Sequence, residues 1–93
     1  MQQYELTLIF KPNLTEDEAD AIINKLKLSV VHRQMWGKRL LAYPINNEKE
    51  GMYMYLVIEM NASDIASLEE KIRLDEHIMR HLLVTAEKHM AVS

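Results

Sequence analysis

Basic side chains gather around the only tryptophan of the sequence, Trp36, and recur nearer the C-terminus. They are Arg33, Lys38, Arg39, Arg73 and Arg80. Cations beside an aromatic ring are the residue types that contact phosphates and stack on bases, so they define a candidate phosphate-binding patch. Alternatively, Lys and Arg on an edge strand only prevent edge-to-edge pairing, and the tryptophan is a core anchor. Composition alone favours the edge-strand interpretation of the cations, whereas the two interpretations of Trp36 are equally consistent with it.

Two histidines have a spacing that can hold a metal ion on a helix. His77 and His81 lie four residues apart, which places two ligands on the same helical face. This segment, however, is predicted to pass from a helix into a strand, where residues four apart are not adjacent. The sequence offers no evident third ligand. We therefore expect no metal site and no cofactor, and histidines that are solvated or face a partner.

Catalytic motifs are missing from the sequence. The two glycines, Gly37 and Gly51, cannot form a Walker loop, a dinucleotide fingerprint or a nucleophile elbow. The lack of cysteine excludes disulfides, thiolate metal sites and cysteine nucleophiles. Clustered carboxylates occupy predicted helix starts and exposed helix faces, where acidic residues are common. We expect no catalytic residues and a protein that is not an enzyme.

Length and charge restrict the class further. The 93 residues fit a single domain, 1–93, with 11 basic and 14 acidic residues and a formal net charge of −3. This charge gives no global attraction to nucleic acid or to an anionic membrane, so any basic contact must be local. The N-terminus lacks secretory-signal features, and the longest apolar run is far shorter than the roughly 20 residues of a membrane helix. We expect a cytoplasmic protein without a membrane role.

The N-terminal half predicts a strand, a helix and a long second strand. Residues 4–10 alternate apolar and polar side chains as a half-buried strand does. Thr15 and Glu18 form a capping-box pattern that begins a short helix, which has no glycine cap at its end. A strand is then predicted from Ser29 to Ile45, with a bend or bulge at Gly37 and its ladder ended by Pro44.

The C-terminal half predicts a hairpin, a second helix and a last strand. A polar turn over residues 46–51 leads into a strand from Met52 to Met60, whose even positions are assigned to the core. Ser63 is the expected N-cap of the second helix, and residues 78–84 form the fourth strand. The order βαββαβ predicts an α+β, ferredoxin-like sandwich, with a four-stranded antiparallel sheet and two helices on one face.

The other face of this sheet is expected to be open and amphipathic. It carries apolar and aromatic side chains beside polar ones. They are Ile9, Tyr53, Tyr55 and Val57, next to Glu5, Thr7 and Glu59. Such a surface packs against a partner or stacks on bases, so function is expected there.

Several of these segments also have a family likeness. The block WGKRLLAYPI from Trp36 to Ile45 is joined by Tyr4-Glu5, by Ile72 to Leu74 and by Ile78 to Arg80. Together they resemble the bacterial small-subunit ribosomal protein S-six (S6) family over nearly the whole chain. Two departures are Gln2-Gln3, where the family commonly has a basic residue, and a shortened link after the first helix.

The resemblance implies a structural, non-enzymatic component of the bacterial small ribosomal subunit. It implies binding to the central domain of 16S rRNA together with ribosomal protein S-eighteen as a heterodimer, and no small-molecule substrate. The residues implied on the RNA side are Lys38, Arg39, Arg73, Arg80 and Tyr4. Those implied for partner packing are Trp36, Tyr53 and Tyr55, although base stacking by the tyrosines stays open. Tyr43-Pro44 is expected only to close the hairpin.

Two other classes use the same fold. One is a regulatory or oligomerisation module that binds a small ligand on the open sheet face, but such a module has no physical reason to carry the block from Trp36 to Ile45. The other is a small acylphosphatase-like enzyme, which needs an arginine and a backbone nest after the first strand. Residues 11–14, Lys-Pro-Asn-Leu, supply no arginine or glycine for that site.

Overall fold

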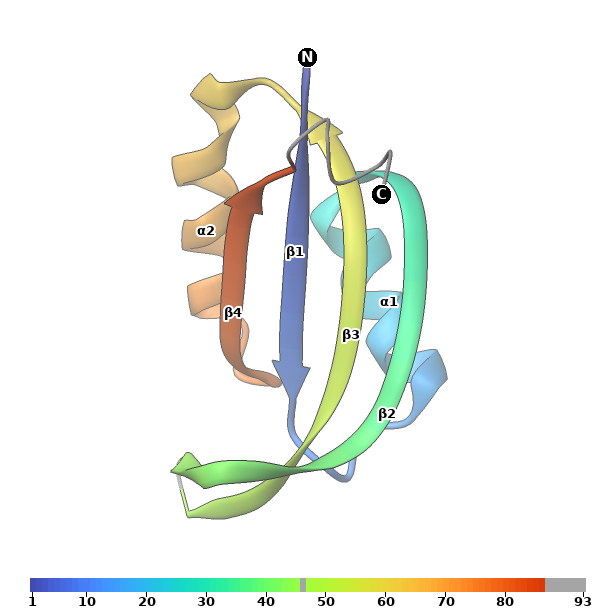
Figure 1. Cartoon of the computed structure of the whole chain (residues 1–93), viewed down its shortest axis with the longest axis vertical. Helices are drawn as coiled ribbons and strands as arrows, with labels where there is room; N and C mark the ends of the chain where they lie inside the picture. The colour runs from blue at the N-terminus through green and yellow to red at the C-terminus, as the bar shows by residue number, and fades with distance from the viewer. Residues whose placement is uncertain (46, 87–93) are drawn as a thin grey trace.

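The architecture is the predicted one. The computed structural model describes residues 1–45 and 47–86, and its elements follow in the order β1 (Gln2–Phe10), α1 (Glu16–Leu26), β2 (Ser29–Ile45), β3 (Glu48–Met60), a 3₁₀ turn (Ala62–Asp64), α2 (Ile65–Leu74) and β4 (Ile78–Thr85). The four strands form one sheet in the order β2-β3-β1-β4, with every neighbouring pair antiparallel. Both helices cover one face of this sheet, which confirms the ferredoxin-like sandwich (Figure 1).

The core lies between the sheet and the helices because both central strands alternate in burial. Leu6, Leu8 and Phe10 of β1 are fully buried, as are Met54 and Leu56 of β3. Apolar residues of both helices pack onto them. They are Ala19, Ile22, Ile23, Leu26, Leu68 and Ile72. The assignment of the even positions of β3 to the core is confirmed.

Helix α1 begins at the predicted capping box. The backbone N–H of Glu18 donates to Thr15 Oγ1 at 3.2 Å, and the backbone N–H of Thr15 donates to Glu18 Oε1 at 2.9 Å. These hydrogen bonds hold the pKa of Glu18 below its usual value. The helix ends at Lys27, which adopts the left-handed conformation with φ 55°. A lysine thus takes the backbone position that glycine commonly occupies.

Three local predictions need correction. Ser63 is not the N-cap of α2, because the chain enters this helix through the 3₁₀ turn and the preceding Asp64 makes no side-chain cap hydrogen bond. The turn predicted over residues 46–51 is shorter, since β3 already begins at Glu48, after a left-handed Asn47 with φ 67°. Pro44 does not end the pairing of β2, because Ile45 still pairs with Glu48 beyond a register shift.

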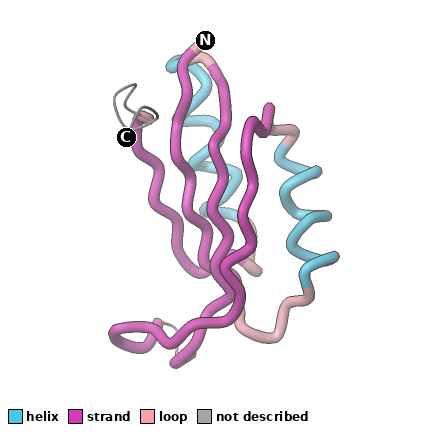
Figure 2. The backbone as a smooth tube through the Cα atoms, turned by 45° about the vertical axis from the view of Figure 1, so that its right-hand side comes forward, coloured by secondary structure: helices cyan, strands magenta, loops and turns pink. Residues whose placement is uncertain are grey.

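The β2–β3 hairpin extends beyond the body of the sheet and bends across its end. We call residues 38–45 and 48–51 the hairpin arm (Figures 1 and 2). A register shift between Met35 and Gly37, where Gly37 has φ 85°, marks the predicted bulge at the start of the arm. Gly51 lies so close to β1 that a Cβ atom there would overlap Ile9 Cγ2. The bend therefore depends on a glycine at that position.

Among the residues with described structure, no helix is long and apolar enough to cross a membrane.

Candidate functional site

The open sheet face carries a packed group of aromatic rings. The rings of Trp36 and Tyr55 are stacked, with centroids 5.5 Å apart and planes 5° from parallel. His32 meets Tyr55 edge to face at 6.4 Å. The indole N–H of Trp36 donates to Gln34 Oε1 at 3.1 Å, so its polar atom is satisfied. We call His32, Trp36 and Tyr55 the aromatic cluster.

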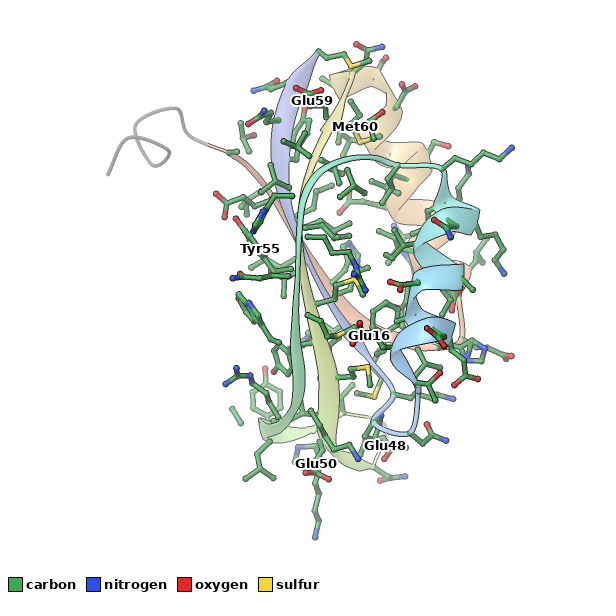
Figure 3. All side chains as sticks on the ribbon, turned by 90° about the vertical axis from the view of Figure 1, so that its right-hand side faces the viewer. Glu16, Glu48, Glu50, Tyr55, Glu59 and Met60 are labelled. Atoms are coloured by element: carbon green, nitrogen blue, oxygen red, sulfur yellow. The ribbon has the colours of Figure 1, made fainter. Side chains whose placement is uncertain are left out.

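Strand geometry explains why these rings meet. Gln34 pairs with Tyr55 across the β2–β3 ladder, and the bulge before Gly37 inserts Trp36 next to this pair. Tyr55 projects from the sheet on the side opposite Glu16 of α1 (Figure 3). Burial raises the pKa of Tyr55 above its usual value, and the nearby carboxylate of Glu5 raises it further. The cluster is thus a half-covered, fixed surface. Its Trp36 side chain is 41% exposed.

The hairpin arm joins the two edges of the sheet. Arg80 Nη1 of β4 donates a hydrogen bond to Tyr43 Oη of β2 at 3.2 Å. The guanidinium carbon of Arg80 also lies 5.8 Å from the centre of the Tyr43 ring, within the range of a cation–π contact. Because β2 and β4 are the two edge strands, only the bend of the arm allows this meeting (Figure 1). The hydrogen bond and the charge of Arg80 lower the pKa of Tyr43.

The structure separates the predicted cations into two groups. Arg39 pairs with Gly51, and Arg80 pairs with Ile9, so both belong to the open-face side of the sheet. Lys38 pairs with Met52 and projects to the opposite side of the strand.

Arg33 and Arg73 belong to the helix side of the molecule. Arg33 forms ion pairs with Asp20 and, at 3.8 Å, with Glu16 of α1. Arg73 on α2 is paired with Glu70 at 3.3 Å. The predicted patch is therefore not one continuous surface, and Arg33 is engaged in fixing α1 to β2.

Tyr4 requires a correction. Its side chain is 7% exposed and lies in the hydrophobic core, because it occupies the helix-facing side of β1 with Leu6 and Leu8. Its hydroxyl donates to Gln2 Oε1 at 3.4 Å. The ring is covered by the protein itself, so the first-strand tyrosine is a core residue and offers no exposed ring face to RNA.

The two histidines that are four residues apart in sequence make different contacts. His77 is in the turn before β4, where its backbone N–H donates to Asp75 Oδ1 at 2.8 Å. His81 Nε2 lies 3.0 Å from Glu69 Oε2 and so links β4 to α2. Within residues 1–45 and 47–86, no group of three metal-ligating side chains comes together.

Sequence reasoning missed several residues of the open face. Leu82 pairs with Thr7 and Val84 with Glu5, and their side chains are 61% and 44% exposed. The alternation of side chains along the predicted strand 78–84 could have placed both residues on the open face. The same periodicity over positions 32, 34 and 36 could have placed His32 and Gln34 beside the tryptophan. No local signal predicts the contact of Tyr43 with Arg80.

An antiparallel sheet with helices on one face and aromatic and basic side chains on the other defines a protein of the ferredoxin-like α+β class. A family model described as ribosomal protein S6 matches residues 3–85. The small ribosomal subunit protein bS6 of Prochlorococcus marinus strain MIT 9303 is 38% identical over 91 residues, which cover 90% of this chain and 73% of that protein. The bS6 protein of strain NATL1A is 40% identical over 88 residues, covering 87% of this chain and 64% of that protein. The chain belongs to the ribosomal protein S6 family.

Solved structures share the fold. The crystal structure of 30S ribosomal protein S6 from Thermotoga maritima matches with a TM-score of 0.82 at 21% identity, covering 98% of this chain and 92% of that one. An uncharacterized protein of the same organism matches with a TM-score of 0.60 at 16% identity, covering 92% of this chain and 98% of that one. At these identities the likeness concerns the fold alone.

Proposed function

We propose that the protein is a structural component of the bacterial small ribosomal subunit, acting in the cytoplasm on the ribosome. It binds the central domain of 16S rRNA as a heterodimer with ribosomal protein S-eighteen. Membership of the ribosomal protein S6 family supports the role in the subunit. The finer claims, RNA contact and the partner, rest on the chemistry of the open face and its arm.

The observation that carries the proposal is the position of Arg39 and Arg80. They come from opposite edge strands, yet both belong to the open-face side, and the arm bends across the sheet to reach Arg80. Exposed guanidinium groups on one surface can contact successive phosphates of an RNA backbone. With a net charge of −3, the chain as a whole has no net attraction for a polyanion. A basic partner therefore supplies the rest of the attraction.

The aromatic cluster fits a protein partner better than an RNA base. One face of the Trp36 ring is covered by Tyr55, and its N–H is already bonded to Gln34. What remains is a rigid aromatic surface on the same sheet face as the exposed Leu82 and Val84 of β4, with Thr7 and Glu5 of β1 between them. Fixed aromatic rings with little polar demand are typical centres of protein interfaces. We assign the cluster, together with Tyr53, to contact with S-eighteen.

Lys38 and Arg73 remain candidates for RNA contact at separate places. Lys38 lies on the arm next to Arg39, but projects to the other side of the strand. Arg73 is exposed on α2 and forms an ion pair with Glu70. A surface ion pair of this kind is weak and can exchange for a phosphate. Each would add a contact outside the open face.

The test is a calorimetric titration of the chain with S-eighteen, followed by a 16S central-domain RNA fragment at two salt concentrations. We expect the two proteins to pair, and RNA to be captured by the pair with an affinity that falls as salt rises. Absence of pairing and of RNA capture would overturn the proposal and favour a small-ligand module. Capture of RNA by the chain alone, with equal affinity, would overturn the role of the partner.

The partner surface is tested in the same titration. Trp36→Ala should weaken pairing with S-eighteen by about tenfold or more if the ring is a central interface residue. Lys25→Ala is the matched control, because Lys25 is an exposed residue of α1 on the covered side of the sheet. Equal effects of the two variants would contradict the assignment of the aromatic cluster.

A further inference from the structure

The contact between Tyr43 and Arg80 joins two parts of the chain that are distant in sequence and in the sheet order. The two residues are 37 positions apart and come from the two edges of the sheet. Both side chains are exposed, so the contact buries little surface and adds little to folding stability. Its effect must therefore be sought in the geometry that it imposes on Arg80.

The contact restrains Arg80 while leaving most of its donors free. Among the described residues, the hydrogen bond to Tyr43 engages only Nη1 of Arg80, and the guanidinium carbon lies over the Tyr43 ring, 5.8 Å from its centre. Arginine carries five N–H donors in a rigid fork, so a bidentate edge is still available to an oxyanion. A flexible arginine loses rotamer freedom when it binds a phosphate, and a restrained one has already lost part of it.

The arm that carries Tyr43 is itself held in place. Gly51 lies against Ile9, and a Cβ atom at this position would also be 3.2 Å from Met79 Cε. The close approach fixes the base of the arm against β1 and β4. The tyrosine is thus presented to Arg80 by packed backbone and not by a freely moving loop.

From this geometry we propose that Tyr43 is a positioning residue, which holds the guanidinium of Arg80 in the orientation that binds an RNA phosphate. The inference rests on the proposed function, since it concerns the RNA contact of the same surface. It assigns to Tyr43 a role beyond closing the hairpin. Tyr43 itself need not touch the RNA.

The experiment compares Tyr43→Phe and Tyr43→Leu in the complex with S-eighteen, using the 16S central-domain fragment over a salt series. Removal of the hydroxyl should weaken RNA binding by about threefold, and removal of both hydroxyl and ring by about tenfold. The salt slope should stay unchanged, because Arg80 and its charge remain. Leu40→Ala, at a 77% exposed position of the same arm, is the matched control and should bind RNA normally.

Coupling to Arg80 distinguishes positioning from direct contact. In an Arg80→Ala background, Tyr43→Leu should cause no further loss, because there is no guanidinium left to orient. A direct RNA contact by Tyr43 would instead give an additive loss, and this outcome would overturn the inference. So would normal RNA binding by Tyr43→Leu.

A second readout is independent of RNA. The NMR signals of the Arg80 side chain should show a ring-current shift that disappears in Tyr43→Leu and is retained in Tyr43→Phe. Failure of the wild-type complex to bind RNA overturns the proposed function and this inference with it. Failure of the Tyr43 variants alone to change binding, while Arg80→Ala weakens it, overturns only the inference.

Discussion

Two tyrosines of the open-face side have pKa values shifted in opposite directions. Tyr43 accepts a hydrogen bond from Arg80, which lowers its pKa below the ordinary 10.0. Tyr55 is partly buried and lies near Glu5, which raises its pKa above the same value. In a pH titration followed by NMR of the ring carbons, we expect Tyr43 to ionise first and Tyr55 last of the two.

The sign of each shift fixes its effect on stability. The lowered pKa of Tyr43 favours the folded state at high pH, and this contribution is lost as pH falls through the lowered value. The raised pKa of Tyr55 acts oppositely, since its contribution is present below pH 10.0 and lost as pH rises above it. Arg80→Ala should return Tyr43 to its ordinary pKa and leave Tyr55 unchanged. An unaltered titration of Tyr43 in this variant would contradict the observed contact.

Gly51 is a position where substitution is expected to destabilise the fold. A Cβ atom there would overlap Ile9 Cγ2 and lie 3.4 Å from the Phe10 carbonyl oxygen. Gly51→Ala should therefore lower the free energy of unfolding by about 1–3 kcal/mol, because the packed side chain of Ile9 or the hairpin arm must move. Urea unfolding measures the loss.

The control for this substitution is a double-mutant cycle with Ile9→Ala, which removes the overlapping methyl group. Part of the loss caused by Gly51→Ala should be recovered in the Ile9→Ala background. Strict additivity of the two changes would show that the hairpin arm does not press on β1 as the structure has it.

At the level of elements, the alternation of β3 between core and open face is the feature most open to test. Leu56 is fully buried, whereas the adjacent Tyr55 is half-buried and stacked on Trp36. Leu56→Ala should cost about 2–5 kcal/mol of unfolding free energy. Tyr55→Ala should cost about 0.5–1.5 kcal/mol through the lost aromatic pair. Thermal and urea unfolding compare the two variants, and tryptophan emission reports the loss of the stack. A larger loss of unfolding free energy for Tyr55→Ala than for Leu56→Ala would mean that Tyr55, and not Leu56, faces the core.

The elements that sequence predicted well are those set by local chemistry. The capping box at Thr15, the bulge at Gly37 and the even-numbered core positions of β3 each follow from residues close in the chain. The bounds of β2 also agree, from Ser29 to Ile45. Short-range hydrogen bonding and side-chain periodicity are sufficient for such features.

The elements that sequence predicted poorly depend on contacts between distant residues. Ser63 has the right type for an N-cap, but the 3₁₀ turn replaces the cap. The family resemblance assigns Tyr4 to the RNA side, although the alternation of residues 4–10 already places it on the same side of β1 as the buried Leu6 and Leu8. The path of the hairpin arm depends on Ile9 meeting Gly51, which no local pattern reveals.

For the molecule as a whole, the topology determines how the cations are distributed. The sheet separates Arg39 and Arg80 on its open-face side from the ion-paired Arg33 and Arg73 on its helix side. An RNA backbone that passes along one side of the molecule can meet only one of these groups. The side of the sheet, and not the total charge, then decides which cations matter.

This separation predicts a graded salt dependence. For the complex with S-eighteen, Arg39→Ala and Arg80→Ala should each reduce the slope of log affinity against log salt by about 1, and together by about 2. The two losses should add, because the residues lie on opposite edge strands and make no direct contact with each other in the structure described. Lys25→Ala on α1 is the control and should leave the slope unchanged. Arg73→Ala tests the separate contact proposed on α2: a reduced slope would support that contact, and an unchanged slope would confine the RNA contact to the open-face side. Unchanged slopes for both Arg39→Ala and Arg80→Ala would contradict the assignment of the open-face cations.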